Sequence, residues 1–204
     1  MRRMLRHSFF SWWSLPVGLA LAGGILGVLF SFLLPFQRAS TVRVFITQPN
    51  AAGLDPYTAI KSTERVASSL SELIYTTTFF DNVLSQTKEI DPTHFPQDDQ
   101  DRRKLWRKTI ETSITPGTGI MSITAFHVDP AQARLIVDGV AREMATQTPT
   151  YFGYNIRVQI IDAPLDSRWF ARPKFAENGA IGAVIGGLLG TILILMRALR
   201  RVGE

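Results

Sequence analysis

Two long stretches without a charged side chain constrain this chain more than any other feature. Between Arg6 and Arg38 the sequence has no Asp, Glu, Lys or Arg, and residues 15–34 are almost wholly apolar. As a helix, these twenty residues would rise about 30 Å, which is the thickness of a bilayer core. Residues 178–196 form a second uncharged stretch, of nineteen residues. We therefore expect two membrane-spanning helices, over residues 15–36 and 177–196.

A secretory signal peptide is the alternative for the first stretch, because Arg2 and Arg3 provide a basic start. The apolar region is, however, longer than the core of a usual signal peptide, and residues 31–36 offer no small-x-small cleavage site. We expect a retained anchor.

The arginines near the two ends predict how the spans are oriented. Three arginines fall in residues 1–6 and three in residues 197–201, whereas residues 38–177 hold 16 basic and 16 acidic side chains. Basic residues next to a span resist translocation, which predicts cytoplasmic tails at residues 1–14 and 197–204 and export of residues 37–176. The net charge of +5 then reflects topology, and we expect no nucleic-acid partner.

Residues 37–176 carry the periodicity of a mixed domain of the α+β class, in the order β-α-α-α-β-β-α-β. Asp-Pro pairs at residues 55–56 and 129–130 each begin a helix with an N-cap and a proline, and Gln132 is placed to complete a capping box. A short glycine-containing loop joins two strands as a hairpin. The expected strands are 41–46, 109–115, 120–128 and 155–162, and the expected helices are 56–74, 79–86, 98–108 and 130–144.

Alternation within these elements predicts which side chains face the core. In the helix that follows Asp55, Ile60 belongs to the predicted buried stripe with Leu70 and Ile74. In the last strand, Ile156, Val158 and Ile160 are predicted to point inward.

The residue types needed for catalysis do not form a recognisable pattern. His7, His94 and His127 fall on a tail, a loop and a strand, without a metal-ligand partner at helical or hairpin spacing. The acids at positions 98, 99 and 101 are typical of a helix start. The sequence contains no phosphate-binding loop, nucleophile elbow or paired-carboxylate motif, and it has no cysteine for a disulfide or thiolate site. We expect neither an enzyme nor a cofactor or metal site.

A basic cluster, comprising Arg102, Arg103, Lys104 and Arg107, allows two interpretations. It is either a solvated helix face or a contact for an anionic glycan or a lipid pyrophosphate, to which arginine binds through two parallel hydrogen bonds. Trp106 lies among these charges and either stacks on a sugar ring or anchors the core.

Glycines recur at four-residue spacing in both apolar stretches. Gly182, Gly186 and Gly190 share one face of the second, and Gly23 and Gly27 share one face of the first. Small residues on one face allow two membrane helices to approach closely. These five glycines are therefore predicted to be helix-packing positions.

Taken along the whole chain, this layout resembles the Wzz-type polysaccharide co-polymerases, or chain-length determinant proteins. Four segments carry the resemblance: residues 35–44 at the exit from the first span, residues 63–70 followed by Phe80 and 83–84, the strand-to-helix step at residues 128–133 with 140–141, and the prolines Pro164 and Pro173 before the second span. In this family several prolines stand close together before the second span, whereas here two remain, nine residues apart. The short exported region is similar to the compact type found in capsule systems.

The resemblance implies a non-enzymatic scaffold in the bacterial inner membrane, with its central domain in the periplasm or otherwise outside the cytoplasm. Homo-oligomeric rings would control the chain length of an O-antigen, capsule or exopolysaccharide. Their partners would be a polymerase or exporter and its lipid-linked glycan. Pro164 and Pro173 would stiffen the membrane-proximal segment. Two alternatives stay open, an activator of a cytoplasmic tyrosine kinase of capsule synthesis and a general envelope or secretion scaffold.

Overall fold

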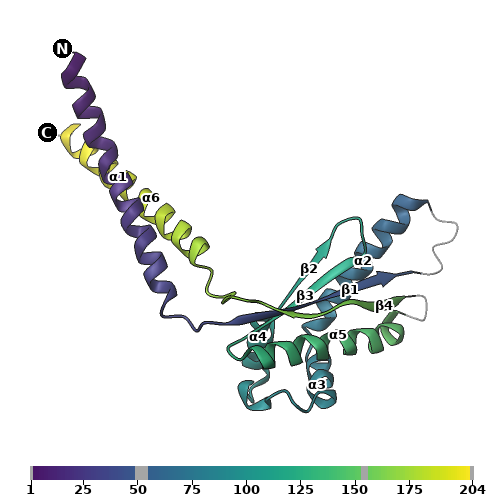
Figure 1. Cartoon of the computed structure of the whole chain (residues 1–204). Coiled ribbons are helices and arrows are strands. Elements are labelled where there is room, and N and C mark those ends of the chain that lie inside the picture. The colour runs from purple at the N-terminus through teal and green to yellow at the C-terminus, as the bar shows by residue number, and fades with distance from the viewer. Residues whose placement is uncertain (1, 49–54, 153–155, 203–204) are drawn as a thin grey trace. The chain divides into compact units, whose positions relative to one another are not determined.

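The structure, a computed structural model, describes residues 2–48, 55–152 and 156–202, without the side chains of residues 2–13, Pro56 and 198–202. The chain divides into two compact units (Figure 1). One contains residues 1–36 and 172–204, and we call it the helix pair. The other contains residues 37–171, and we call it the sheet domain. His7 and five of the six arginines near the ends lie outside the described side chains.

The helix pair consists of α1, Arg2–Ser31, and α6, Phe175–Val202. Both helices extend beyond the predicted spans toward the chain termini, since α1 begins at Arg2 and α6 ends at Val202. At its other end α1 is shorter, because residues 32–36 are not helical. The N–H groups of Phe32, Leu33 and Leu34 instead donate to carbonyls three residues back, at 3.1, 3.1 and 3.2 Å. Pro35 favours this end, because it has no N–H to donate to the Ser31 carbonyl and its ring would clash with that group in a helix.

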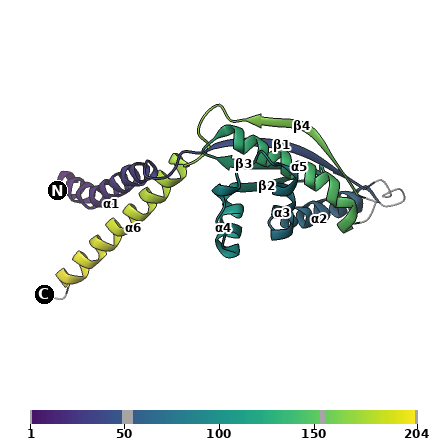
Figure 2. The ribbon, with the colours of Figure 1, turned by 90° about the horizontal axis from the view of Figure 1, so that it is seen from below.

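The sheet domain is a mixed α/β fold with one four-stranded antiparallel sheet, in the order β2-β3-β1-β4 (Figures 1 and 2). Helices α3, α4 and α5 lie along the same face of this sheet (Figure 1). The mixture of helices with one sheet and the two terminal apolar helices agree with the expectation from sequence. The strands are β1 Arg38–Thr47, β2 Ile110–Thr115, β3 Ile120–His127 and β4 Arg157–Asp166. The helices are α2 Pro56–Ile74, α3 Thr77–Gln86, a 3-10 turn Pro92–His94, α4 Asp99–Thr109 and α5 Pro130–Phe152.

Short polar side chains begin the helices as the sequence predicts. The Asp55 carboxylate accepts from the N–H groups of Tyr57 and Thr58, and the Asp98 carboxylate accepts from those of Gln100 and Asp101. Each carboxylate thereby satisfies two backbone donors that have no partner within the helix. The Thr58 hydroxyl also donates to the Asp55 carboxylate, at 2.8 Å. The hydrogen bonds from Thr58 and Tyr57 lower the pKa of Asp55, with that of the Thr58 hydroxyl as the largest cause.

Two predictions about α5 are wrong. The helix continues past Met144 to Phe152 with Pro149 inside it, where the buried Thr148 hydroxyl donates to the Met144 carbonyl at 2.6 Å. No capping box forms at its start. The Gln132 side chain instead accepts from the N–H of Asp91 at 3.0 Å and donates to the Glu89 carbonyl at 3.1 Å. Gln132 therefore holds the loop that precedes the 3-10 turn against α5.

The core lies between the sheet and the helices packed on it. Val42, Val44 and Ile123 of the central strands are fully buried, as are Ile136 and Val140 of α5. Two residues that alternation places inside are exposed instead, Ile60 at 42% and Ile160 at 41%. Ile60 is in the first turns of α2, and Ile160 is on β4, an edge strand whose register against β1 shifts just beyond it. The predicted first residue of this strand, Asn155, lies outside the described residues.

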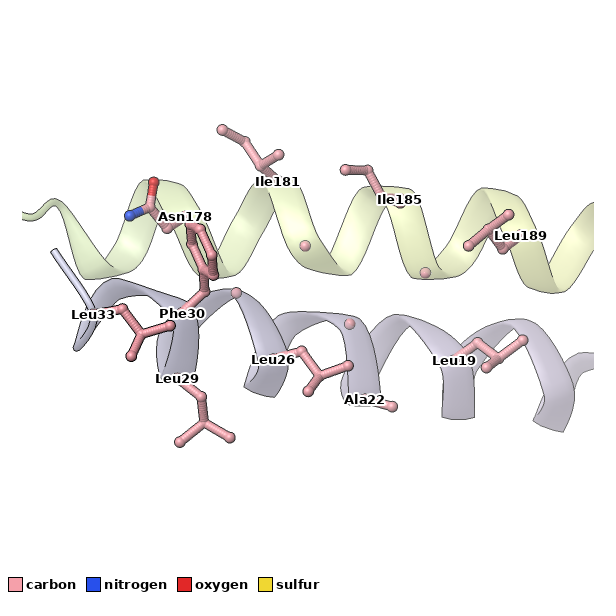
Figure 3. Close-up of a pocket in the computed structure, with 14 residues that line it drawn as sticks. Leu19, Ala22, Leu26, Leu29, Phe30, Leu33, Asn178, Ile181, Ile185 and Leu189 are labelled. Atoms are coloured by element: carbon pink, nitrogen blue, oxygen red, sulfur yellow. The ribbon is translucent and has the colours of Figure 1, made fainter.

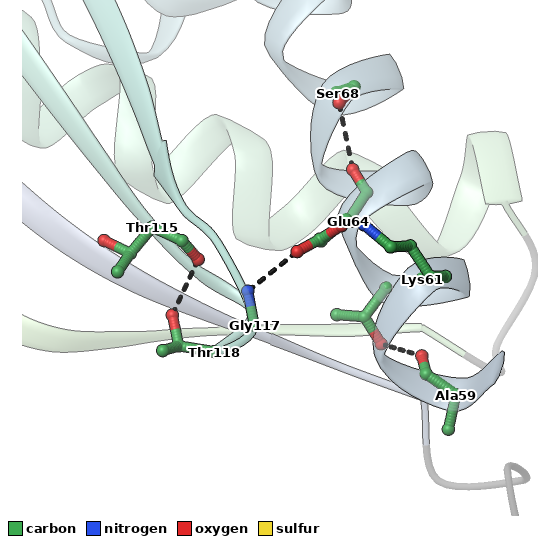
Figure 4. A network of polar contacts seen from close by, with 8 residues as sticks. Ala59, Lys61, Glu64, Ser68, Thr115, Gly117 and Thr118 are labelled. Atoms are coloured by element: carbon green, nitrogen blue, oxygen red, sulfur yellow. Dashed lines mark hydrogen bonds and ion pairs between the residues drawn. The ribbon is translucent and has the colours of Figure 1, made fainter. Parts of the chain in front are cut away.

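A polar network joins α2 to the hairpin between β2 and β3 (Figure 4). The Glu64 carboxylate accepts from the Gly117 N–H at 2.7 Å and from the Lys61 ammonium at 2.8 Å. These contacts lower the pKa of Glu64, with the Lys61 hydrogen bond as the largest cause. Gly119 has a φ of +68°, and a Cβ there would lie 2.8 Å from the Ile46 carbonyl oxygen. The hairpin therefore requires glycine where it approaches β1.

Candidate functional site

The glycines of α6 contact the backbone of α1 within the same chain. A Cβ atom at Gly190 would lie 2.5 Å from the Cα of Pro16, and one at Gly186 would overlap the carbonyl group of Leu19. At Gly182 an added Cβ would overlap the Gly23 carbonyl. Such overlaps leave no room for any side chain, because both partners are backbone. Glycine is therefore required along this whole face of α6.

The two glycines of α1 complete the same contact from the other side. A Cβ at Gly23 would overlap the Gly182 carbonyl, and one at Gly27 would overlap the Asn178 carbonyl. The five predicted packing glycines thus lie in one seam between α1 and α6. Gly18 provides the contrast, since a Cβ there has no atom within 4 Å.

A polar contact closes this seam near the end of α1. Asn178 Nδ2 donates to Ser31 Oγ at 2.8 Å, and Ser31 Oγ donates to the Gly27 carbonyl at 3.0 Å. Ser31 is fully buried. Next to it, the rings of Phe32, Phe36 and Phe175 form a cluster with centroids 5.2 to 6.2 Å apart. The sequence gives no periodic signal for this contact, because Ser31 and Asn178 are 147 positions apart.

A groove of about 760 Å³ follows one side of the seam (Figure 3). Side chains on both helices border it, including Leu26, Phe30, Ile181 and Ile185. Its lining is almost entirely apolar, and Asn178 at one end is its only polar side chain among the described residues. The groove can accept a lipid acyl chain or an apolar helix but offers almost no hydrogen bonds to a polar ligand.

The two predicted prolines occupy different kinds of backbone. Pro164 lies inside β4, where the pairing shifts between Asp162 opposite Arg43 and Leu165 opposite Thr41. An edge strand with a bulge tolerates proline, which has no N–H to donate. Only Pro173 stands in the connection to α6. The resemblance places both prolines in one membrane-proximal segment, whereas Pro164 belongs to the sheet.

Pro164 is also held by α5. Its carbonyl accepts from Arg134 Nη2 at 3.0 Å, and Arg134 Nη1 lies 3.4 Å from the Asp166 carboxylate. Asp166 in turn accepts from Ser40 Oγ at 2.7 Å. These contacts fix the last residues of β4 against β1 and α5.

The basic cluster of α4 is engaged in local contacts. Arg102 binds Asp99 at 2.6 Å and lies over the Phe80 ring, and Arg103 donates to Thr77 Oγ1 at 2.6 Å. The two other bases of the cluster also have acidic neighbours: Lys104 Nζ is 2.9 Å from Asp101, and Arg107 is 3.9 Å from Glu72. The bond to Asp101 raises the pKa of Lys104. Neighbouring carboxylates therefore offset much of the positive charge that an anionic glycan would meet.

Trp106 is a core anchor, which resolves the choice that the sequence left open. It is 1% exposed, and its Nε1 donates to the Ile74 carbonyl at 2.7 Å. Its ring packs with Phe80 and Phe95 at centroid distances of 4.9 and 5.9 Å. It cannot stack on a sugar without unfolding this cluster.

The fold brings together two histidines that sequence spacing separates. The rings of His94 and His127 stand 4.4 Å apart between centroids, and His127 Nδ1 accepts from the Asp129 N–H at 3.0 Å. Burial lowers the pKa of His94, His127 lowers it further, and Asp91 opposes the shift. Among the side chains that the structure describes, no three His, Cys, Asp or Glu residues gather as metal ligands.

A buried acid was also missed by sequence reasoning. Glu143 of α5 is fully buried, and its two carboxylate oxygens accept from Asn82 Nδ2 at 2.7 Å and Gln86 Nε2 at 2.6 Å. Both donors come from α3. Glu143 therefore joins α3 to α5 through neutral amide donors.

The described chain thus combines a glycine-packed helix pair with an α/β sheet domain. Residues 14–31 of α1 and 175–197 of α6 are long and apolar enough to cross a membrane. No protein-family model matches the chain, and no curated protein matches it.

Proposed function

We propose that this chain is a non-enzymatic membrane scaffold that spans the inner membrane twice and exports its sheet domain. The observation that carries the proposal is the exposed apolar surface of the helix pair. Leu21 is 66% exposed, Leu26 65% and Val184 62%, although each is a large apolar side chain. Burying such a side chain is worth about 2 kcal/mol, so a helix pair in water would forgo that stabilisation many times over. In a membrane these apolar side chains would contact lipid, so that stabilisation would not be lost.

The connections between the units support a tether at both ends of the sheet domain. Strand β1 begins at Arg38, seven residues after α1 ends at Ser31, and β4 ends at Asp166, nine residues before α6 begins at Phe175. These two strands are neighbours in the sheet. The chain therefore enters and leaves the sheet domain through two adjacent strands, which suits a domain carried on the membrane surface.

We further propose that several copies assemble around the machinery that polymerises a surface polysaccharide and control the length of its product. The resemblance to chain-length determinants supports this part of the proposal. Because the glycines are occupied by contacts within one chain, the contact between copies must use other surfaces. The groove bordered by Leu26, Phe30, Ile181 and Ile185 is one surface that a neighbouring apolar helix would fit.

The proposal is tested by complementing a deletion strain and measuring the length distribution of its surface glycan. Gly186→Leu breaks the seam and should broaden or shift the distribution. Gly18→Leu is the matched control, because a Cβ atom at position 18 would have no atom within 4 Å, and it should restore the wild-type pattern. An unchanged glycan in the deletion strain itself would contradict the role in polysaccharide assembly. Loss of tyrosine phosphorylation on a partner kinase, with glycan length unchanged, would support the kinase activator instead.

A further inference from the structure

The segment between β4 and α6 exposes two aromatic side chains. Trp169 is 82% exposed, more than any other large apolar side chain that the structure describes, and Phe170 is 54% exposed. With so little of its surface buried, the Trp169 side chain contributes little hydrophobic stabilisation in water. A tryptophan ring favours the interface between lipid and water. An aromatic pair next to a membrane span is typical of an interfacial belt.

Backbone pairing keeps this segment close to the chain that leaves α1. The Ser167 N–H donates to the Ala39 carbonyl at 2.7 Å, and the Ala171 N–H donates to the Gln37 carbonyl at 2.8 Å. Trp169 lies midway between these two hydrogen bonds. It precedes Phe175, the first residue of α6, by six positions, so its backbone cannot be more than about 20 Å from the start of that helix. The segment between β4 and α6 is therefore short enough for Trp169 to reach a headgroup layer at the start of α6.

The same segment is basic. Arg168, Arg172 and Lys174 lie within seven residues of the start of α6, and Glu177 pairs with Lys174 at 3.1 Å. Arg38 on the facing strand donates to the Arg168 carbonyl at 3.3 Å and lies over the Phe170 ring at 5.2 Å. These three bases equal in number the arginines at residues 197–201, so they weaken the charge bias that orients α6. Anionic lipid headgroups would supply negative charge next to these bases.

We propose that Trp169, Phe170, Arg168, Arg172 and Lys174 form a lipid-binding collar that seats in the headgroup layer and binds anionic lipid. The aromatic rings enter the interface, and the basic groups bind phosphate oxygens through charge-assisted hydrogen bonds. The inference depends on the two membrane spans but not on any role in polysaccharide assembly.

The experiment uses the full chain in phosphatidylcholine vesicles that contain lipid brominated high on the acyl chain, with and without phosphatidylglycerol. Because Trp169→Phe removes one of four tryptophans, the difference in emission between wild type and this variant isolates Trp169. We expect the Trp169 emission to be blue-shifted and quenched by brominated lipid, and to be quenched more when phosphatidylglycerol is present. Trp106→Phe, treated in the same way, should isolate an emission that lipid does not quench, because Trp106 is buried in the sheet domain.

The charged part of the collar is tested by Arg168→Gln with Lys174→Gln. This double variant should lose the additional quenching caused by phosphatidylglycerol and keep the quenching seen in phosphatidylcholine. Three results would overturn the inference: Trp169 emission that brominated lipid does not quench, quenching indifferent to phosphatidylglycerol, or a blue shift that disappears as protein is diluted into lipid. The last result would show that a second copy of the chain covers Trp169.

Discussion

Gly186 of α6 lies directly on the backbone carbonyl of Leu19 in α1, with no space between them for a side chain. Contact between two backbones lets the helices gain dispersion energy along their length, which lipid cannot supply as well as a close-fitting helix can. This one relationship explains why glycine recurs at four-residue spacing in α6, and it makes the seam open to direct tests.

The seam predicts an engineered disulfide. A Cβ at Gly187 would lie 3.6 Å from the Cβ of Ala20, within the range found in disulfides. Ala20→Cys with Gly187→Cys should therefore oxidise to an intramolecular bond, visible as a mobility shift in non-reducing gels. The chain has no native cysteine to compete. Pairing Gly187→Cys with Gly18→Cys should give little product, and efficient bonding of that pair would place the seam elsewhere.

Filling the seam should separate the helices. Gly186→Leu is expected to cost about 2 kcal/mol or more, because its side chain has to displace backbone. In the Ala20→Cys, Gly187→Cys background it should abolish the cross-link, whereas Gly18→Leu should leave the yield unchanged. A full cross-link in the presence of Gly186→Leu would contradict the packing described here.

Buried Glu143 predicts a large loss of stability in the sheet domain. Glu143→Ala leaves the amide groups of Asn82 and Gln86 without an acceptor and should cost about 3 kcal/mol. Urea unfolding of the full chain in detergent, followed by tryptophan fluorescence, measures the change. Glu72→Ala is the control, since Glu72 is largely exposed and 3.9 Å from Arg107, and its loss should cost about 0.5 kcal/mol or less. Equal effects of the two variants would refute the role of Glu143.

The histidine pair predicts a pH dependence. The pKa of His94 is lowered in the folded state, so near pH 6 the folded chain binds fewer protons than the unfolded chain. The stability contributed by neutral His94 is complete above its unfolded pKa, about 6.5, and is lost as the pH falls below that value. The urea midpoint should decrease between about pH 7 and about pH 5.5, and His94→Gln should decrease less. Identical decreases would show that other groups titrate there.

Much of this fold could be predicted from local sequence signals. Asp55 and Asp98 cap helices where the pattern indicates, and the glycine spacing of α6 predicts a packing face because it depends only on helical periodicity. Predictions from local patterns were wrong where a contact with a residue distant in sequence determines the partner or the burial of a side chain. Gln132 leaves its own helix to bind the loop at Glu89 and Asp91, and Ile160 loses its buried position at the edge of the sheet.

The features that sequence missed all depend on tertiary contact. His94 and His127 are 33 positions apart and meet only when the 3-10 turn packs beside β3. Ser31 and Asn178 come from opposite ends of the chain. Trp106 gave no local indication of whether it lies in the core, because most of its neighbours in sequence are charged and only the fold places Phe80 and Phe95 around it.

The central claim is that the sheet domain is exported while both chain ends stay inside, and cysteine labelling in intact cells tests it most directly. A single cysteine at exposed Ser113 in β2, or at Arg197 near the end of α6, is treated with a thiol reagent that cannot cross the inner membrane. The account predicts labelling at position 113 in intact cells, and labelling at position 197 only after the membrane is permeabilised. Labelling of position 197 from outside, or protection of position 113, would contradict it.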